Sequence, residues 1–248
     1  MSILDRQTHK DLETWRKLLS KAITAIEIVE RETSQKQSIR LGGGTVLSAL
    51  WGHRYSQDVD LFTRDPQIIA YLRPWLNDEI AAVLGNDYVD GGNAIKFRVG
   101  GGAIDIVASS DILTDSSPTI EEYRGRMIEI EDPAEILAKK LYHRGDRGTV
   151  RDYVDLVRGM QEIPDLAKRL SKPLGNKIRG ATEVLRQIPN DRFESELAKV
   201  RFIGPPPEAR QLKSEAIAAL EKIGGPFDDN DGQKRAAWQA MQGRGPGY

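Results

Sequence analysis

Apolar side chains recur every three or four residues between residues 8 and 33, a period that predicts an amphipathic helix. Later apolar runs are short and bounded by glycine or polar residues, as in strands, and two of them flank residues 100–102 as in a hairpin. The strands expected from these runs cover residues 38–41, 58–63, 94–99, 103–108 and 126–130. The further helices expected cover residues 45–52, 65–84 with a candidate break at Pro74, 133–144, 149–162, and 164–222 with interruptions at 173–175 and 204–207.

This pattern divides the chain into a half that mixes strands with helices and a half that is helical. We expect an α/β (α+β) domain over residues 1–131, in which helices flank a mixed sheet. An α-helical domain is expected over residues 132–223. Residues 224–248 are mostly polar and rich in glycine, which favours a flexible tail.

The helical half opens with a strong start signal. Asp132 can cap the first turn, and Pro133 suits the first helical position because that residue needs no N–H partner. Glu135 can reach back to the cap and close a capping box.

Composition narrows the function classes. With 248 residues, 39% of them hydrophobic, the chain is long enough to bury a substantial core. It contains no cysteine, so disulfides, thiolate zinc sites and cysteine nucleophiles are excluded. The polar N-terminus lacks the apolar core of a secretory signal, and no apolar run approaches the ~18 residues that span a bilayer. We therefore expect a cytoplasmic protein without membrane contact.

The formal net charge is −1, but the charge is unevenly distributed. Residues 167–186 carry six basic side chains against the single acid Glu183. Such a segment can contact phosphates, and it can equally be the solvated face of a helix.

Asp58 and Asp60 are two carboxylates in an otherwise apolar run. Residues i and i+2 of a strand share a face, so both carboxylates point the same way. Neighbouring carboxylates repel each other, and one is pushed toward protonation unless a cation compensates them. Hard oxygen ligands suit Mg²⁺, so the pair is a candidate metal site. The alternative is an acidic pair that only faces solvent.

Gly43, Gly44 and Thr45 open the helix that precedes this strand. A glycine-rich turn lets backbone N–H groups approach a phosphate, and the field at a helix N-terminus favours an anion. The dinucleotide-binding fingerprint fails because Leu47 stands at its third glycine, and no Lys-Ser/Thr pair follows as in a P-loop. The turn therefore predicts a phosphate cradle beside the metal site, unless it is a plain strand–turn–helix corner.

The glycine turn, a gap of twelve residues and the aspartate pair together resemble the signature of the polymerase-beta-type nucleotidyltransferase superfamily. Within the gap, Arg54 and Ser56 complete the pattern Arg-x-Ser-x-Asp-x-Asp, which resembles the AbiEii/AbiGii branch, the nucleotidyltransferase toxins of abortive-infection and toxin–antitoxin systems. The resemblance implies an NTP substrate and Mg²⁺ or Mn²⁺ held by Asp58 and Asp60. The nucleotide-binding residues that it implies are Gly43, Gly44, Thr45, Arg54, Ser56 and, from the second motif below, Lys140.

Asp105 is a lone charge in an apolar strand, which costs free energy unless the carboxylate is paired or bound to metal. Two-metal phosphoryl transfer often uses a third acid on a neighbouring strand. Members of the superfamily commonly place such an acid on a later strand, so the resemblance adds Asp105 to the catalytic and metal-binding residues. The alternative is an ion pair with Lys96 or Arg98 across the hairpin.

The helix that starts at residue 133 offers two lysines. In helical projection Lys140 falls within the apolar stripe, whereas Lys139 falls on the opposite side, toward solvent. A buried lysine needs an anionic partner such as a triphosphate, or its charge reaches solvent along the surface of the core. Trp51 and Trp75 occupy apolar positions and are expected in the core.

A second motif begins at the same helix. The order Glu-x-x-Ala-x-Lys-Leu, then Arg, then Arg-Asp-x-x-Asp-Leu resembles AbiEii-type proteins and selects Lys140 as the family lysine. It also marks Asp152 as a catalytic residue and Asp155 as a further candidate, since both lie on one helix face. Asp155 could instead pair with Arg151 or Arg158 on its own helix.

The motifs together predict transfer of an NMP from an NTP to a hydroxyl, with release of pyrophosphate. Lys140 and Arg54 would neutralise the triphosphate, and Asp105 would hold a second metal or polarise the attacking hydroxyl. The resemblance implies an RNA acceptor, notably the tRNA end, a type IV toxin–antitoxin role and a cognate antitoxin. The alternatives are transfer to a small molecule, as in antibiotic-modifying relatives, and a non-catalytic nucleotide- or partner-binding module.

Overall fold

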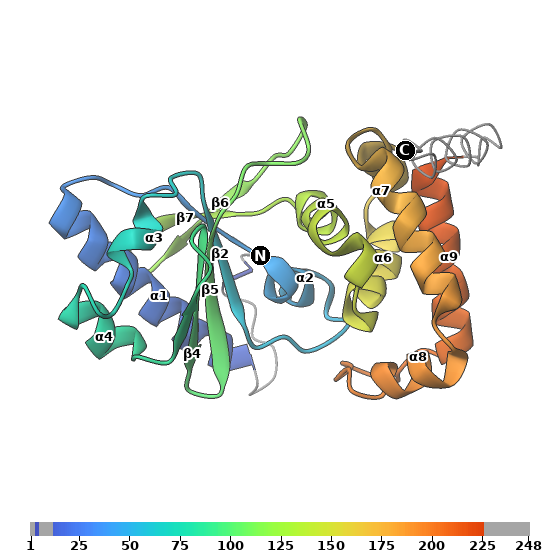
Figure 1. Ribbon diagram of the computed structural model, residues 1–248, viewed down its shortest axis with the longest axis horizontal. Coiled ribbons are helices and arrows are strands. Elements are labelled where there is room, and N and C mark those ends of the chain that lie inside the picture. The colour runs from blue at the N-terminus through green and yellow to red at the C-terminus, as the bar shows by residue number, and fades with distance from the viewer. Residues whose placement is uncertain (1–2, 5–11, 226–248) are drawn as a thin grey trace, which may run out of the picture.

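A seven-stranded mixed sheet organises the first half of the chain (Figure 1). The structure, a computed structural model, describes residues 3–4 and 12–225. The strand order is β3-β4-β5-β2-β1-β7-β6, with β1 antiparallel to β2 and parallel to β7, and β2 parallel to β5. The strands are β1 (Ile39–Gly42), β2 (Val59–Thr63), β3 (Tyr88–Asp90), β4 (Ala94–Val99), β5 (Gly102–Ala108), β6 (Thr119–Tyr123) and β7 (Arg126–Ile130).

The five predicted strands are all present, with ends that differ by at most one residue, and β4 and β5 form the predicted hairpin. The apolar pattern did not predict β3 and β6, which are the two edge strands. Most of their side chains are exposed or half-buried, so they carry little apolar alternation. The sequence therefore predicted the buried centre of the sheet better than its edges.

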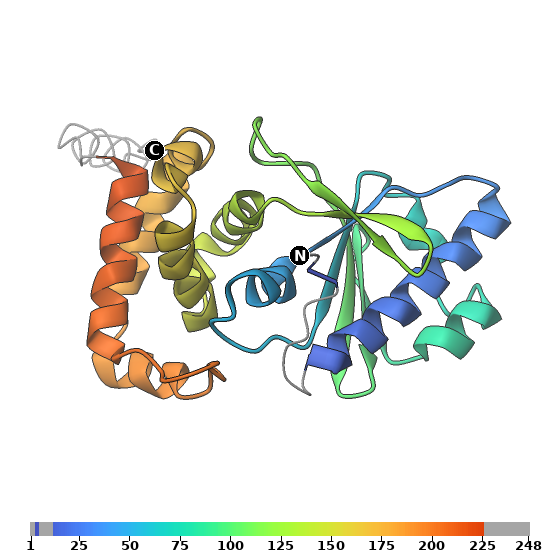
Figure 2. The same ribbon diagram turned by 180° about the vertical axis from the view of Figure 1, so that it is seen from behind.

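Helices cover the sheet unevenly (Figures 1 and 2). On one face, α1 (Leu12–Thr33), α3 (Ile68–Tyr71) and α4 (Asp78–Leu84) pack on β2, β4 and β5. On the other face, α2 (Gly43–Trp51) packs on β1 and β2. On the side of the sheet that carries α2, strands β3, β4 and β5 are therefore more open than on the side that carries α1, α3 and α4.

The helix expected over residues 65–84 is interrupted around the candidate break at Pro74 and forms two short helices. The chain leaves α3 at Tyr71, and Pro74 lies in the segment before α4, where Asn77 accepts hydrogen bonds from the Glu79 and Ile80 N–H groups. Trp75 lies in this segment and is 69% exposed, so its expected place in the core is wrong. Trp51 is half-buried and packs against the core, as predicted.

The second half is helical, as expected. It contains α5 (Pro133–Arg144), a 3₁₀ turn (Gly145–Arg147), α6 (Val150–Glu162), α7 (Leu166–Gln187), α8 (Asn190–Leu197) and α9 (Ala209–Gly224). The interruption predicted near residue 175 is a kink at Gly175, and the chain between α8 and α9 contains the predicted break at 204–207. The tail predicted for residues 224–248 lies outside the described residues from position 226 onward. Within the described ranges, no helix has both the length and the apolar character to cross a membrane.

The start of α5 differs from the predicted capping box. Asp132 caps the helix by accepting from the Ala134 N–H, as expected. The Glu135 carboxylate instead accepts from the N–H groups of Ile112 and Leu113, at 2.7 and 2.8 Å. Glu135 therefore fixes the loop after β5 onto α5, because two backbone donors of that loop have no strand partner there.

Candidate active site

A cavity of about 470 Å³ lies between the open face of the sheet and the helices α2, α5 and α6. All of the sequence-predicted site residues line this cavity except Thr45 and the further candidate Asp155. Its lining residues are Gly43, Gly44, Arg54, Ser56, Asp58, Asp60, Phe62, Lys96, Asp105, Val107, Glu131, Ile136, Lys139, Lys140, His143, Arg144, Arg151 and Asp152. Segments separated by more than 90 residues thus meet at one place.

The floor of the cavity is a row of residues across four neighbouring strands. Strand register places Gly42 of β1 opposite Asp60 of β2, Asp60 opposite Asp105 of β5, and Asp105 opposite Lys96 of β4. Asp58 lies on the same side just before β2, and its Oδ1 accepts from the Ala103 N–H at 2.9 Å. The predicted convergence of the three aspartates on one side of the sheet is therefore present.

Asp60 is the buried carboxylate in the middle of this row. Burial raises the pKa of Asp60 to about 6, and the neighbouring Asp105 adds to this, while Lys140 and Arg144 oppose it. Asp105 carries the ion pair named above as the alternative, since Lys96 Nζ lies 2.6 Å from its Oδ2. Among the described residues no cation bonds to Asp60 directly, so the middle of the row is a place of excess negative charge.

The glycine turn presses directly on this carboxylate. Gly43 has φ +70°, and a Cβ at this position would lie 1.8 Å from Asp60 Oδ2. Only glycine permits both the backbone conformation and the close approach. Helix α2 begins at Gly43, two residues earlier than expected, and no side chain caps this end. The unsatisfied N–H groups of its first turn are therefore next to Asp60.

Thr45 differs from its expected role. It is fully buried, and its hydroxyl donates to the Asp58 carbonyl and lies 3.0 Å from the Ser56 hydroxyl. The hydroxyl that was expected to contact phosphate instead ties α2 to the start of β2. Thr45 thus holds the glycine turn and the aspartates in register.

Charged side chains from the α2–β2 connection and the helical half form the opposite wall. Arg54 is buried, and its Nε and Nη2 donate to Asp155 at 2.6 and 2.7 Å. Lys140 Nζ lies 2.7 Å from Asp152 and 3.2 Å from Asp155, and His53 Nε2 lies 2.8 Å from Asp155. Asp155 therefore pairs with residues of other elements, and not with Arg151 or Arg158 as the sequence alternative allowed.

These contacts shift the acids of the wall in the opposite direction to Asp60. Burial alone would raise the pKa of Asp155, but Lys140 and Arg54 outweigh it and hold this pKa well below its usual range. Burial is likewise outweighed at Asp152, whose pKa is lowered by Lys140 and Arg144 and by a hydrogen bond from the Thr149 N–H. Both carboxylates are therefore ionised and paired with protein cations, whereas no cation among the described residues bonds to Asp60.

Lys139 contradicts its predicted position. It is buried, with Nζ 2.5 Å from Glu131 Oε1, 3.8 Å from a Glu135 oxygen and 4.2 Å above the centre of the Phe62 ring. The projection failed because α5 packs on α2, α6 and α7 and has almost no solvent side, so apolar positions do not mark one buried stripe. Lys140 is the less buried of the two lysines.

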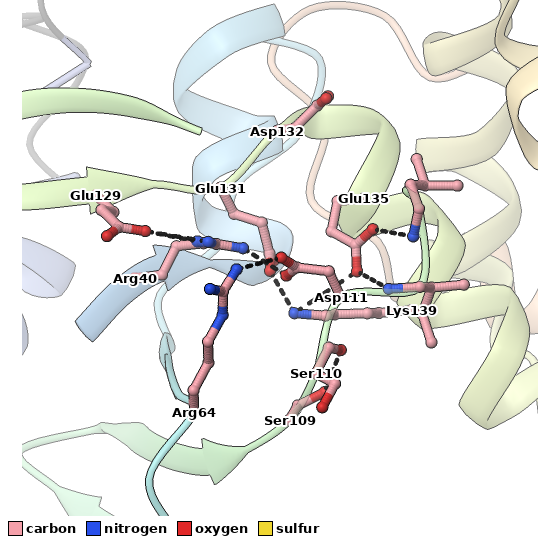
Figure 3. Close-up of polar contacts among 12 residues, drawn as sticks. Arg40, Arg64, Ser109, Ser110, Asp111, Glu129, Glu131, Asp132, Glu135 and Lys139 are labelled. Carbon is pink, nitrogen blue, oxygen red and sulfur yellow. Dashed lines mark hydrogen bonds and ion pairs between the residues drawn. The ribbon is translucent and has the colours of Figure 1, made fainter. Parts of the chain in front are cut away.

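Figure 3 shows a second group of acids beside Lys139. Carboxylate oxygens of Asp111, Glu131 and Glu135 lie within 4.8 Å of one another, a spacing that could hold a metal ion. Lys139 contacts both glutamates, and Arg40 lies 2.6 Å from Asp111. Cations of the chain itself thus contact all three acids, although burial still raises the pKa of Glu131 to about 7 and its Oε2 has no hydrogen-bond partner among the described residues.

Sequence reasoning missed several residues of the cavity. Arg144 and Arg151 add to its positive wall, and His143, Glu131 and Lys139 also line it. Burial and nearby cations lower the pKa of His143, so its ring adds no charge at neutral pH. The spacing of Arg144 four residues after Lys140 could have revealed its place on the same helix face. Nothing in the sequence signals Glu131, because its role depends on where β7 ends beside Gly42.

The basic segment of α7 is only partly available. Arg169 pairs with Asp115 and Asp132, Lys177 donates to the Tyr142 carbonyl, and Arg186 pairs with Glu183 and Glu221. These residues hold the helices together. Lys168 and Lys172 are exposed.

The family comparison agrees with the motifs. A family model described as "Nucleotidyl transferase AbiEii toxin, Type IV TA system" matches residues 27–244. No curated protein matches the chain. Among solved structures, the chain is similar to MenT4, a nucleotidyltransferase toxin from Mycobacterium tuberculosis H37Rv, at 15% identity and a TM-score of 0.46, over 92% of this chain and 89% of that one.

Proposed function

The chain belongs to the AbiEii family of nucleotidyltransferase toxins of type IV toxin–antitoxin systems, and from this premise we propose a metal-dependent transfer of an NMP from an NTP to an RNA hydroxyl. The observation that carries the proposal is the floor of the cavity. Asp60 and Asp105 lie side by side on adjacent strands, directly beneath the Gly43 turn, with Asp58 next to them.

The donor set fits a divalent cation. It consists of carboxylate oxygens, which Mg²⁺ and Mn²⁺ prefer. Asp60 is buried beside Asp105, its burial and this neighbour both raise its pKa, and no cation among the described residues bonds to it directly. A bound Mg²⁺ would polarise the phosphate oxygens and stabilise the charge that develops on the leaving pyrophosphate. Asp58, Asp60 and Asp105 are the residues that would hold it.

The remaining wall suits the triphosphate. The backbone N–H groups at Gly43 and Gly44 open a helix and favour an anion there. Lys140, Arg144 and Arg151 line the cavity opposite the sheet and can pair with phosphate oxygens. Arg54 supports this wall through Asp155, because two of its donors are already engaged there.

The reaction then forms a bond between the acceptor oxygen and the α-phosphorus and breaks the bond to pyrophosphate. The proton of the acceptor hydroxyl passes to the Asp105 carboxylate. Asp152 takes no part in the bond changes and holds Lys140 and the start of α6, where it also bonds the Thr149 N–H and hydroxyl. This is a positioning role within the catalytic set.

An RNA acceptor is favoured over a small molecule by the openness of the site on the Asp105 side. The Lys96 side chain next to Asp105 is 43% exposed, and beyond it the sheet continues to an exposed edge. An enclosed acidic pocket there would suit a cationic small molecule. The RNA acceptor and the family both favour a cytoplasmic site of action.

The test is incubation of the protein with each labelled NTP, Mg²⁺ and total RNA including tRNA, with Asp58→Ala as the control. We expect one or more NTPs to label RNA with wild type and none with the variant. Labelling of an added aminoglycoside, with no labelling of RNA, would contradict the RNA proposal and favour the small-molecule alternative.

Lys168 and Lys172 are proposed as a second contact with the RNA. Charge reversal at both positions should weaken RNA binding without unfolding the chain, because both side chains are exposed. Reversal at Arg169 is unsuitable for this test, since Arg169 is needed by Asp115 and Asp132. Unaltered RNA binding in the double reversal would remove α7 from the proposal.

A further inference from the structure

The row of residues on the cavity floor has a direction. It runs from Gly42 through Asp60 and Asp105 to Lys96, and the next register position on β3 is Val89. The Gly43 turn, where the triphosphate is proposed to bind, lies at the first end. The open edge of the sheet lies at the other end.

Phosphoryl transfer places the attacking oxygen opposite the leaving oxygen. If pyrophosphate leaves from the end of the row near Gly43, the acceptor hydroxyl must arrive from the side of Asp105 and Lys96. Lys96 is the cavity residue that lies furthest along the row in that direction. Its ammonium is therefore next to the path of the acceptor.

The surface beyond Asp105 is open to a ligand. The side chains of Lys96 and Arg98 are 43% and 61% exposed, and Val89 is 51% exposed. Lys96 and Arg98 are two residues apart on β4 and so share the face that carries Asp105's partner. This face has two cations and an exposed apolar side chain, which suit the phosphates and the sugar of a polynucleotide. Arg98 also pairs with Asp87 at 3.0 Å, through an ion pair whose side chains are both more than half exposed.

The ion pair of Lys96 supports a role in contacting the acceptor. Lys96 pairs with Asp105. In the proposed reaction a divalent metal ion would take up part of the negative charge of Asp105. The Lys96 ammonium then needs another anion, and the last internucleotide phosphate of the acceptor is the anion that arrives on this side.

From this geometry we propose that Lys96, flanked by Arg98 and Val89, forms the binding site for the 3′-terminal nucleotides of a single-stranded RNA acceptor. The inference rests on the proposed function and adds the acceptor's path across β5, β4 and β3. Lys96 contacts the last internucleotide phosphate and positions the RNA, whose free 3′-hydroxyl gives its proton to Asp105.

The test compares Lys96→Met and Lys96→Arg with Lys199→Met, a control that removes another exposed lysine from an ion pair with a nearby acid. Binding of a 5′-fluorescein single-stranded RNA is measured by anisotropy without NTP, at several salt concentrations. We expect Lys96→Met to weaken binding about 3- to 10-fold and to lower the salt dependence by about 0.7, the contribution of one phosphate contact to a single strand. Lys96→Arg should keep most of the binding, and the control should match wild type.

Steady-state transfer separates this role from simple neutralisation of Asp105. Lys96→Met should raise KM for RNA and leave KM for the NTP unchanged. A lower kcat with unchanged RNA binding and unchanged KM for RNA would overturn the inference, because Lys96 would then act only on Asp105. Val89→Glu provides a second test: it places a negative charge on an edge strand at a side chain that is 51% exposed, and it should weaken RNA binding.

The two levels of the proposal fail differently. Wild type that labels no RNA with any NTP contradicts the proposed function, and this inference with it. Wild type that labels RNA normally, together with Lys96→Met and Val89→Glu variants that bind RNA like wild type, contradicts only the acceptor site.

Discussion

Two groups of carboxylates lie close to Phe62, and they differ in how their charge is balanced. Asp111, Glu131 and Glu135 are closely spaced, but Lys139 and Arg40 bond to them and two backbone N–H groups bond to Glu135. Asp58, Asp60 and Asp105 face an open cavity with Lys96 as their one directly bonded cation among the described residues.

The difference shows that proximity of acids does not by itself indicate a metal site. A carboxylate cluster that the chain has already neutralised loses ion pairs when it binds a metal, whereas an uncompensated cluster gains them. A raised pKa does not separate the two groups, because burial raises the pKa of Glu131 to about 7 and that of Asp60 to about 6. The proposed catalytic group is distinguished by the cavity that all three of its carboxylates line, and by the lack of a cation bonded to Asp60 among the described residues.

The largest expected effect concerns the compensated group. Lys139→Met leaves the buried Glu131 and Glu135 without their cation and should lower the free energy of unfolding by about 3–5 kcal/mol. Lys96→Met removes a lysine that is 43% exposed and should cost no more than about 1 kcal/mol. Urea denaturation of both variants measures this, and equal losses would contradict the contrast between the two groups.

The next effect concerns the catalytic group. Asp58→Asn keeps the shape of the side chain and removes its charge, so it should lower nucleotidyl transfer by about a thousandfold, the equivalent of about 4 kcal/mol in the transition state. The same exchange at Asp111, which is half-buried and outside the cavity lining, should leave the rate within a few-fold of wild type. A comparable rate loss in both variants would mean that the two groups act as one site.

A third test addresses the close approach of backbone and carboxylate. Gly43→Ala forces an L-residue into φ +70° and places Cβ against Asp60, so it should destabilise the fold by at least about 1–2 kcal/mol and impair transfer. Gly52→Ala, at φ +58° with open space around it, carries the backbone strain alone. If transfer falls equally in both, the contact with Asp60 has no catalytic importance.

The smallest effect is a pH dependence of stability. The pKa of Asp60 is raised to about 6 in the folded chain from an ordinary 3.8, so the folded state binds a proton more tightly than the unfolded chain does. The resulting stabilisation is complete below about pH 4 and is lost as the pH rises through 6. Without metal, the free energy of unfolding of Asp60→Asn should therefore exceed that of wild type at pH 8 by roughly 1 kcal/mol after screening. At pH 4 the two free energies should be equal. A constant difference between pH 4 and pH 8 would contradict the assignment.

The same contrast explains what the sequence could predict. Asp58, Asp60, Asp105 and the glycine turn were predictable, because strand alternation and hairpin register place residues locally and these elements are adjacent in the sheet. Lys139 was not, because its burial depends on three helices that pack around α5 from later and earlier parts of the chain.

The role of Glu135 was missed for a related reason. Its sequence position suits a capping box, but loop residues 112 and 113 compete for the same carboxylate, and that loop is ordered only by the tertiary fold. Trp75 was misplaced because the break at Pro74 turns the segment outward. Local chemistry was thus predictable where neighbours along the chain supply the partners.

The most direct test is an anomalous difference map from crystals soaked in Mn²⁺ with a non-hydrolysable NTP analogue. The account predicts a Mn²⁺ peak bonded to Asp58 and Asp60, beneath the Gly43 turn. A peak among Asp111, Glu131 and Glu135, with none beside Asp60, would contradict it.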